Sequence, residues 1–143
     1  MDRVTPEARS RIMSLVTARH GRTTEKRLRA LLIQRGIRGW KMDGRGLPGR
    51  PDFVFSLSKI AVFVDGCFWH GCKRCRKMSK SNVRFWSQKI LLNARRDTRV
   101  SRRLRALSWG VLRIRECELK DPLRRPRLMA RLEWRLQNKG KRG

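Results

Sequence analysis

The sequence predicts an α/β fold in which a small mixed sheet is flanked by helices. Three observations predict it: two short apolar runs four residues apart, a long helical pattern after them, and a third apolar run beyond that pattern. A hairpin followed by a helix and a strand implies a right-handed crossover, so the last strand lies parallel to the second. The chain has 143 residues, enough for one core, and we expect a single domain over residues 1–143.

Two helices are expected before the sheet. Thr5-Pro6-Glu7 supplies an N-cap residue, a proline at the first helical position and an acid in the first turn, so the first helix runs to about Val16. The second helix starts at Thr24-Glu25 and stops at Gly36. One face of the second helix carries the leucines Leu28, Leu31 and Leu32.

The apolar runs Phe53–Phe55 and Ile60–Val64 predict a β-hairpin, after a stretch of mostly turn residues over 39–49. Asp52 precedes the first run and Asp65 follows the second. In an antiparallel pair these two carboxylates emerge at the same end of the sheet. Both are also ordinary residues for strand ends beside proline or glycine, and that structural alternative stays open.

A long helix is expected from about Asn82 until Gly110 ends it, followed by a strand over Val111–Ile114. A last helix covers roughly Arg125 to Leu136, and residues 137–143 form a basic tail. The long helix carries an apolar stripe with two polar residues, Asn93 and Asp97, in its middle; the apolar members are Trp86, Ile90, Val100, Leu104 and Leu107. A buried carboxylate at Asp97 needs a histidine, a metal-bound water or an arginine as partner.

The charge of the chain points to a polyanionic partner. Lys and Arg number 38 against 11 Asp and Glu, a net charge of +27, so DNA or RNA is favoured over an acidic protein or a small molecule. The sequence has no Tyr, which excludes a covalent tyrosyl–DNA intermediate. No apolar run reaches about 18 residues and no signal core opens the chain, so we expect a cytoplasmic protein without a membrane partner.

Several side chains have the chemistry of a nucleic-acid-cleaving site. Asp52 and Asp65, two of only eleven acids, suit Mg²⁺ held against a phosphodiester. His70 follows closely and suits general acid or base work, although a lone histidine is more often structural or a ligand than a catalyst. Phe68 and Trp69 suit either core packing or a wedge between base pairs.

Four cysteines predict a structural zinc site. Their spacing is Cys67-x₄-Cys72-x₂-Cys75, with Cys117 directly after the parallel strand. Four thiolates close a tetrahedral zinc site, and a reducing compartment favours metal over disulfides. Free or buried thiols are the alternative.

The sequence resembles the very short patch repair (Vsr) DNA mismatch endonucleases over nearly its whole length. Two long motifs carry the resemblance: Leu47-Pro48-Gly49-Arg50-Pro51-Asp52-Phe53-Val54 and Phe63-Val64-Asp65-Gly66-Cys67-Phe68-Trp69-His70-Gly71-Cys72. Shorter matches in the same order include Thr24-Glu25-Lys26-Arg27-Leu28, Phe85-Trp86, Asn93, Arg96-Asp97 and Glu116-Cys117.

The resemblance implies a restriction-endonuclease-like core that nicks one strand at a T:G mismatch, the lesion left when 5-methylcytosine deaminates. It implies that Asp52 binds Mg²⁺ with the backbone carbonyl of Val64. His70 would be the catalytic histidine; Asp65, five residues before it in the chain, is our candidate for the same catalytic set from its place at the strand end. Glu25 and Asp97 would orient histidines or bound water.

The resemblance also assigns DNA contacts. Phe68 and Trp69 would intercalate beside the mismatch, and Met13 would insert from the opposite groove. Residues 1–22 then form a DNA-binding helix and arm. Arg50 and Asn93, which stand in the matched motifs, are assigned to DNA binding as well. We expect a monomer acting at the bacterial nucleoid, with a cytosine methyltransferase and mismatch-repair proteins as candidate partners.

Two departures from the family pattern bear on the site. Some members have histidine where this chain has Asp65, and two carboxylates at Asp65 and Asp97 favour a second cation or a shared proton. A zinc ligand that is commonly histidine is here Cys75. Two other classes of protein remain as alternatives: a non-catalytic, zinc-braced protein that distorts DNA, and a basic protein that binds RNA or ribosomes.

Overall fold

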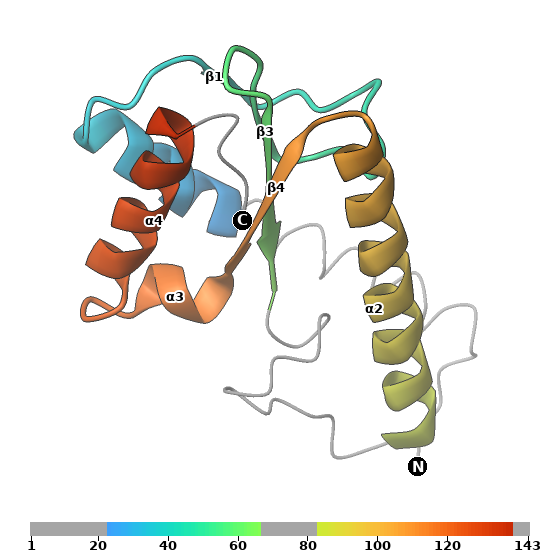
Figure 1. The fold of residues 1–143 in the computed structure, drawn as a ribbon. Helices are drawn as coiled ribbons and strands as arrows, with labels where there is room; N and C mark the ends of the chain where they lie inside the picture. The colour runs from blue at the N-terminus through green and yellow to red at the C-terminus, as the bar shows by residue number, and fades with distance from the viewer. Residues whose placement is uncertain (1–22, 67–82, 139–143) are drawn as a thin grey trace.

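The computed structural model describes residues 23–66 and 83–138 (Figure 1). The helix expected to end near Val16, the arm over residues 1–22 and most of the basic tail lie outside these ranges.

Within residues 23–66 and 83–138 the sheet has four strands: β1 (Trp40–Lys41), β2 (Phe53–Phe55), β3 (Ile60–Asp65) and β4 (Gly110–Arg115). Their order is β1-β2-β3-β4; β1 and β3 each pair antiparallel with β2, and β4 pairs parallel with β3. The predicted hairpin and the parallel return are confirmed. The strand β1 was not expected within the turn-rich stretch, and its Trp40 ring packs edge-on against Phe53, with 5.7 Å between ring centroids.

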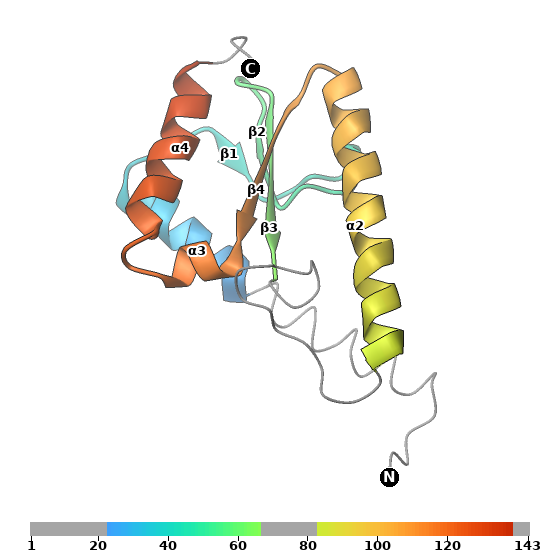
Figure 2. The same ribbon diagram turned by 60° about the horizontal axis from the view of Figure 1, so that its bottom comes forward.

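Helices cover both faces of the sheet (Figure 2). Among the described residues, the long helix α2 (Val83–Ala106) lies on one face, and α3 (Glu116–Lys120), α4 (Arg125–Gln137) and a helix over residues 23–34 lie on the other. Strands covered on both sides read as continuous apolar runs, which explains why five of the six residues of β3 are buried. The predicted sheet flanked by helices is therefore confirmed.

Two apolar cores separate these layers. Because side chains alternate along a strand, Ile60 and Val62 enter the larger core and Ala61 and Phe63 enter the smaller one. The larger core joins the sheet to the helix over 23–34, α3 and α4; its fully buried members include Leu28, Leu32, Phe53, Ile114, Leu119, Met129 and Leu132. The smaller core packs Leu104 of α2 against β3 and β4.

The helix ends show how turn chemistry terminates each element. The helix over 23–34 ends as predicted, with Gly36 at φ +69° and the Ile37 N–H donating to the Leu32 carbonyl at 2.9 Å. The prediction that Gly110 ends the long helix is wrong: α2 stops at Ala106, and Gly110 opens β4. Ser108 adopts the left-handed conformation instead, with φ +67°.

Two further differences concern the packing of these segments. Leu107 lies past the end of α2 and is 54% exposed, so its predicted place on the packed stripe is wrong. The short helix α3 was not expected, because its five residues, Glu116-Cys117-Glu118-Leu119-Lys120, contain one apolar anchor, Leu119. That single buried leucine is too weak a periodic signal to predict a helix from sequence.

Candidate active site

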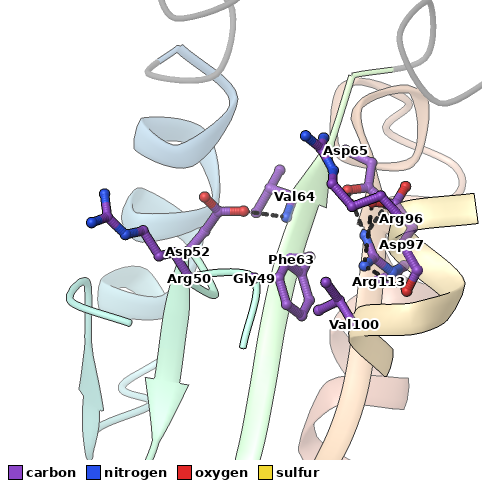
Figure 3. Close-up of a pocket in the computed structure, with 10 residues that line it drawn as sticks. All are labelled: Gly49, Arg50, Asp52, Phe63, Val64, Asp65, Arg96, Asp97, Val100 and Arg113. Atoms are coloured by element: carbon purple, nitrogen blue, oxygen red, sulfur yellow. Dashed lines mark hydrogen bonds and ion pairs between the residues drawn. The ribbon is translucent and has the colours of Figure 1, made fainter. Parts of the chain in front are cut away.

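A pocket of about 460 Å³ opens at the end of the sheet where β3 stops (Figure 3). It is formed by the loop before β2, the end of β3, one side of α2 and the middle of β4. Its lining residues are Gly49, Arg50, Asp52, Phe63, Val64, Asp65, Arg96, Asp97, Val100 and Arg113. Three carboxylates and three guanidinium groups therefore share one opening.

The loop before β2 reaches the pocket through a tight turn. Gly49 has φ +75° and Arg50 has φ +50°, both in the left-handed region. A Cβ on Gly49 would lie 2.4 Å from a methyl group of Val100 on α2, so the backbone approaches the helix as only glycine allows. This contact fixes the loop that carries Arg50 and Asp52 against α2.

Asp52 is anchored from two directions. Its Oδ2 accepts a hydrogen bond of 2.7 Å from the backbone N–H of Val64, across the β2–β3 hairpin (Figure 3). Its carboxyl group also shares a hydrogen bond with Glu25. A hydrogen bond between two carboxyl groups needs a proton on one of them, which is one cause of the raised pKa of Asp52.

Burial and this second carboxyl group perturb Asp52 strongly. Removal from water and then the hydrogen bond with Glu25 raise the pKa of Asp52 from 3.8 to about 8, against the opposing effect of the Val64 N–H. The negative charges of Glu25 and Asp65 act in the same direction. A carboxyl group shifted this far, in a pocket, is typical of a functional site.

Glu25 is held in place by the start of its helix. Leu28 and Leu32 on the same helix are fully buried in the larger core. The Thr24 hydroxyl donates to the Glu116 carboxylate on α3 at 3.4 Å, within the protein interior. Packing and this bond together direct the first helical turn, and with it Glu25, toward Asp52.

A second charged group lies on the α2 side of the pocket. Arg113 Nη1 donates to both carboxylate oxygens of Asp65, at 3.1 and 3.2 Å, and Arg113 Nη2 lies 3.6 Å from Asp97 Oδ1. The guanidinium carbon stands 4.3 Å from the centre of the Phe63 ring. Figure 3 shows Asp52 on one side of the end of β3 and this group on the other.

The structure brings most of the predicted residues that it describes to this pocket. Asp52, Val64, Asp65, Asp97 and Arg50 line it, and Glu25 reaches it through the hydrogen bond to Asp52. Two others stand apart from the lining: Asn93, half-buried on α2, and Cys117, on α3. Seven predicted residues lie outside the described ranges: Met13, Cys67, Phe68, Trp69, His70, Cys72 and Cys75.

Sequence reasoning did not identify Arg113. The parallel register pairs Phe63 with Arg113 and Asp65 with Arg115, so Arg113 faces the α2 side two residues before the end of the sheet. The available signal was an arginine inside the apolar run Val111–Ile114, because a charge in a covered strand needs a partner. Of the partners considered for Asp97, the structure shows the arginine ion pair.

Carboxylates gathered beside a strand end, within a protein of net charge +27, indicate a class of protein: a nuclease of mixed α/β fold. The family described as DNA mismatch endonuclease Vsr matches residues 1–77, more than half of the chain. The chain belongs to this family and is a DNA endonuclease. The resemblance seen in the motifs is thereby confirmed.

Individual relatives match this chain over most of its length. The Type II nicking enzyme V.XorIIP of Xanthomonas oryzae pv. oryzae is 40% identical over 139 residues, which cover 96% of this chain and 95% of that protein. The Type II nicking enzyme V.NmeDIP of Neisseria meningitidis serogroup C is 42% identical over 115 residues, 79% of this chain and 76% of that protein. The DNA mismatch endonuclease Vsr of Escherichia coli K12 is 41% identical over 98 residues, 67% of this chain and 62% of that protein. Within the described part of the chain, no helix has the length and apolar composition of a membrane span.

The raised pKa of Asp52 predicts that, in buffer without divalent cations, the free energy of unfolding falls as the pH rises. The folded value of about 8 exceeds the unfolded value of 3.8, so the folded state retains a proton that the unfolded state releases. Stability from this group is complete below about pH 4 and is lost as pH rises toward 8. Asp52→Asn should therefore raise the free energy of unfolding at pH 8 by about 1–3 kcal/mol, measured by urea denaturation. A gain equally large at pH 4 would contradict this cause.

Proposed function

We propose that this endonuclease is Mg²⁺-dependent and nicks one strand of duplex DNA at T:G mismatches, as in very short patch repair. The observation that carries the proposal is the carboxyl pair of Asp52 and Glu25 in the pocket at the end of the sheet. The pair is partly buried, and no described cation forms an ion pair with either carboxyl group. Such a pair is costly to the fold unless a cation joins it.

The residues present fit Mg²⁺. This ion takes oxygen ligands and is commonly bound through one or two protein carboxylates, with waters and substrate phosphates completing the shell. Asp52 and the Val64 carbonyl would hold it, and Glu25 would orient a bound water. When bound, the ion would neutralise the negative charge that develops on the phosphoryl group during cleavage. The described residues hold no cluster of three or more His, Cys, Asp or Glu side chains arranged for a metal.

The other groups of the pocket suit a phosphodiester substrate. Arg50 is exposed at the opening and is positioned by the turn at Gly49, so its guanidinium is available to a backbone phosphate. His70, four residues beyond Gly66, is proposed to transfer a proton during the attack of water on phosphorus. Asp65 and Asp97 are proposed to act in the same catalytic set, and the ion pairs with Arg113 support their place beside the pocket.

Mismatch recognition is proposed from the resemblance. Phe68 and Trp69 would open the base stack beside the mismatch, with Met13 entering from the other groove. Asn93 precedes Arg96 and Asp97, which line the pocket, by about one turn of α2. This position suits a contact close to the cleaved strand. A methyltransferase of matching sequence preference and mismatch-repair proteins are the proposed partners.

A structural zinc ion is proposed to brace the segment after β3. Cys117 lies two residues beyond Arg115, which pairs with Asp65 at the last rung of the sheet. Cys67 lies two residues beyond Asp65, and two residues span at most about 7 Å. The chain therefore leaves β3 and β4 at neighbouring positions, Asp65 and Arg115. This supports the proposal that Cys67, Cys72, Cys75 and Cys117 share one tetrahedral site.

A nicking assay tests the proposed function against its rivals. Duplexes carrying each mismatch, with randomised flanks, are incubated with the zinc-loaded protein with and without Mg²⁺. We expect one nick, on the T strand of T:G duplexes, that requires Mg²⁺. Duplex bending without any nick would instead identify a DNA-distorting protein. Stronger binding to ribosomal RNA than to any duplex would identify an RNA-binding protein.

A further inference from the structure

Arg113 occupies the part of the pocket opposite Asp52. Its two terminal nitrogens reach Asp65 at 3.1 Å and Asp97 at 3.6 Å, so one guanidinium joins a carboxylate from β3 and a carboxylate from α2. Arg113 Nη2 also lies 3.5 Å from the Asp97 backbone carbonyl. One arginine thus ties the end of the sheet to the middle of the long helix.

The side chains of Arg113, Asp65 and Asp97 are largely shielded from water, which strengthens the electrostatic interactions among them. Side-chain exposure is 24% for Arg113, 11% for Asp65 and 19% for Asp97. Two carboxylates this close, in this degree of burial, repel each other unless positive charge lies between them. A buried ion pair resists removal of one partner, because the remaining charge is left without compensation.

The guanidinium is held rigidly as well as paired. The Phe63 ring covers one face of it at 4.3 Å, and Phe63 is itself buried in the smaller core beneath α2. Arg113 rises from β4, whose backbone pairs with β3 at both flanking positions. A divalent cation entering at Asp65 would have to displace an arginine fixed by backbone, ring and two carboxylates.

We propose that Arg113 is a positioning residue that takes the place of a second divalent cation at Asp65 and Asp97, so that the pocket accepts one divalent ion, at Asp52. This inference rests on the proposed function, which puts that ion at Asp52. It replaces the second cation or shared proton that the sequence favoured for Asp65 and Asp97.

Counting bound Mn²⁺ tests the inference without measuring cleavage. Mn²⁺ is titrated into the full-length, zinc-loaded protein, and bound ion is counted by electron paramagnetic resonance. We expect one equivalent for the unchanged protein, lost in Asp52→Asn. Arg113→Met should bind a second equivalent, which the double variant with Asp65→Asn should lose. Arg113→Lys keeps the charge and should keep one equivalent.

Arg96→Met is the matched control, because Arg96 also lines the pocket but forms no ion pair with a described residue. It should keep one equivalent. Thermal unfolding gives a second readout: Mn²⁺ should raise the Tm of Arg113→Met more than that of the unchanged protein or of Arg96→Met. If Arg113→Met unfolds without divalent ions, Mn²⁺ should restore a cooperative transition.

The outcomes distinguish a failure of the role of Arg113 from a failure of the ion site at Asp52. Two equivalents in the unchanged protein, one of them lost in Asp65→Asn, would overturn the inference and leave the ion at Asp52 in place. One equivalent in Arg113→Met, with no added effect of Mn²⁺ on its Tm, would also overturn it. Binding unaffected by Asp52→Asn would instead overturn the proposed function.

Discussion

Asp52→Asn should nearly abolish strand cleavage and leave duplex binding nearly unchanged. The asparagine oxygen can still accept the hydrogen bond from the Val64 N–H, so the hairpin keeps its geometry. What is lost is the negative charge that would hold Mg²⁺ and, with it, several kcal/mol of stabilisation of the transition state. At 1.36 kcal/mol for each factor of ten, this predicts a loss of about three orders of magnitude in the rate of nicking. Single-turnover nicking of a T:G duplex measures it.

Asp43→Asn is the matched control for this prediction. Asp43 lies nine residues earlier, is exposed, and hydrogen-bonds to Arg45 outside the pocket. Its replacement removes the same charge from the same loop and should change the nicking rate less than twofold at saturating duplex. Cleavage by Asp52→Asn at the unchanged rate, or an equal loss in Asp43→Asn, would rule out the catalytic assignment.

Removal of zinc should destabilise the protein more than any single surface substitution. Structural zinc contributes on the order of 10 kcal/mol to the folding of small zinc-binding segments. We expect one zinc per chain by elemental analysis after gentle purification, and a marked fall in Tm when a chelator removes it. Cys117→Ser should show the same fall and retain no zinc.

The chelator provides the internal control for Cys117→Ser. If zinc accounts for the effect, the chelator should lower the Tm of the unchanged protein and have no further effect on the variant. Cys117 is half-buried beside Arg124, so a loss of local packing is the competing explanation. Zinc-free protein with the full Tm would show that the cysteines form no structural zinc site.

The parts of the fold that the sequence predicted are those with strong local signals. The hairpin of β2 and β3 follows from two apolar runs bounded by turn residues, and the helix that ends near Gly36 follows from three leucines on one face and a glycine stop. The parallel return of β4 follows from the order of the elements. Each depends on residues close together in the chain.

The parts that the sequence did not predict depend on contacts between distant residues. Gly110 looked like a helix stop, yet its N–H donates to the Lys59 carbonyl at 2.8 Å, and its missing Cβ makes room for Ile60. The glycine therefore serves strand packing, and Ser108 turns the chain. The strand β1 exists because Trp40 packs on Phe53, thirteen residues away.

In the candidate site, too, some residues were predicted from the sequence and others needed the structure. Asp52 and Asp65 were predicted to emerge at one end of the sheet from strand order alone, and both line the pocket. The link between Asp65 and Asp97 required knowledge of which of many arginines reaches them. With 38 basic residues in the chain, composition cannot single out Arg113; the register of β3 and β4 does.

The central claim is that Asp52 holds the ion that enables this endonuclease to cut DNA. Anomalous scattering from crystals grown with Mn²⁺ and a T:G duplex places that ion directly. We expect one strong Mn²⁺ peak within ligand distance of the Asp52 carboxylate and the Val64 carbonyl, beside a phosphate of the T strand. Peaks at other carboxylates with none at Asp52 would contradict it.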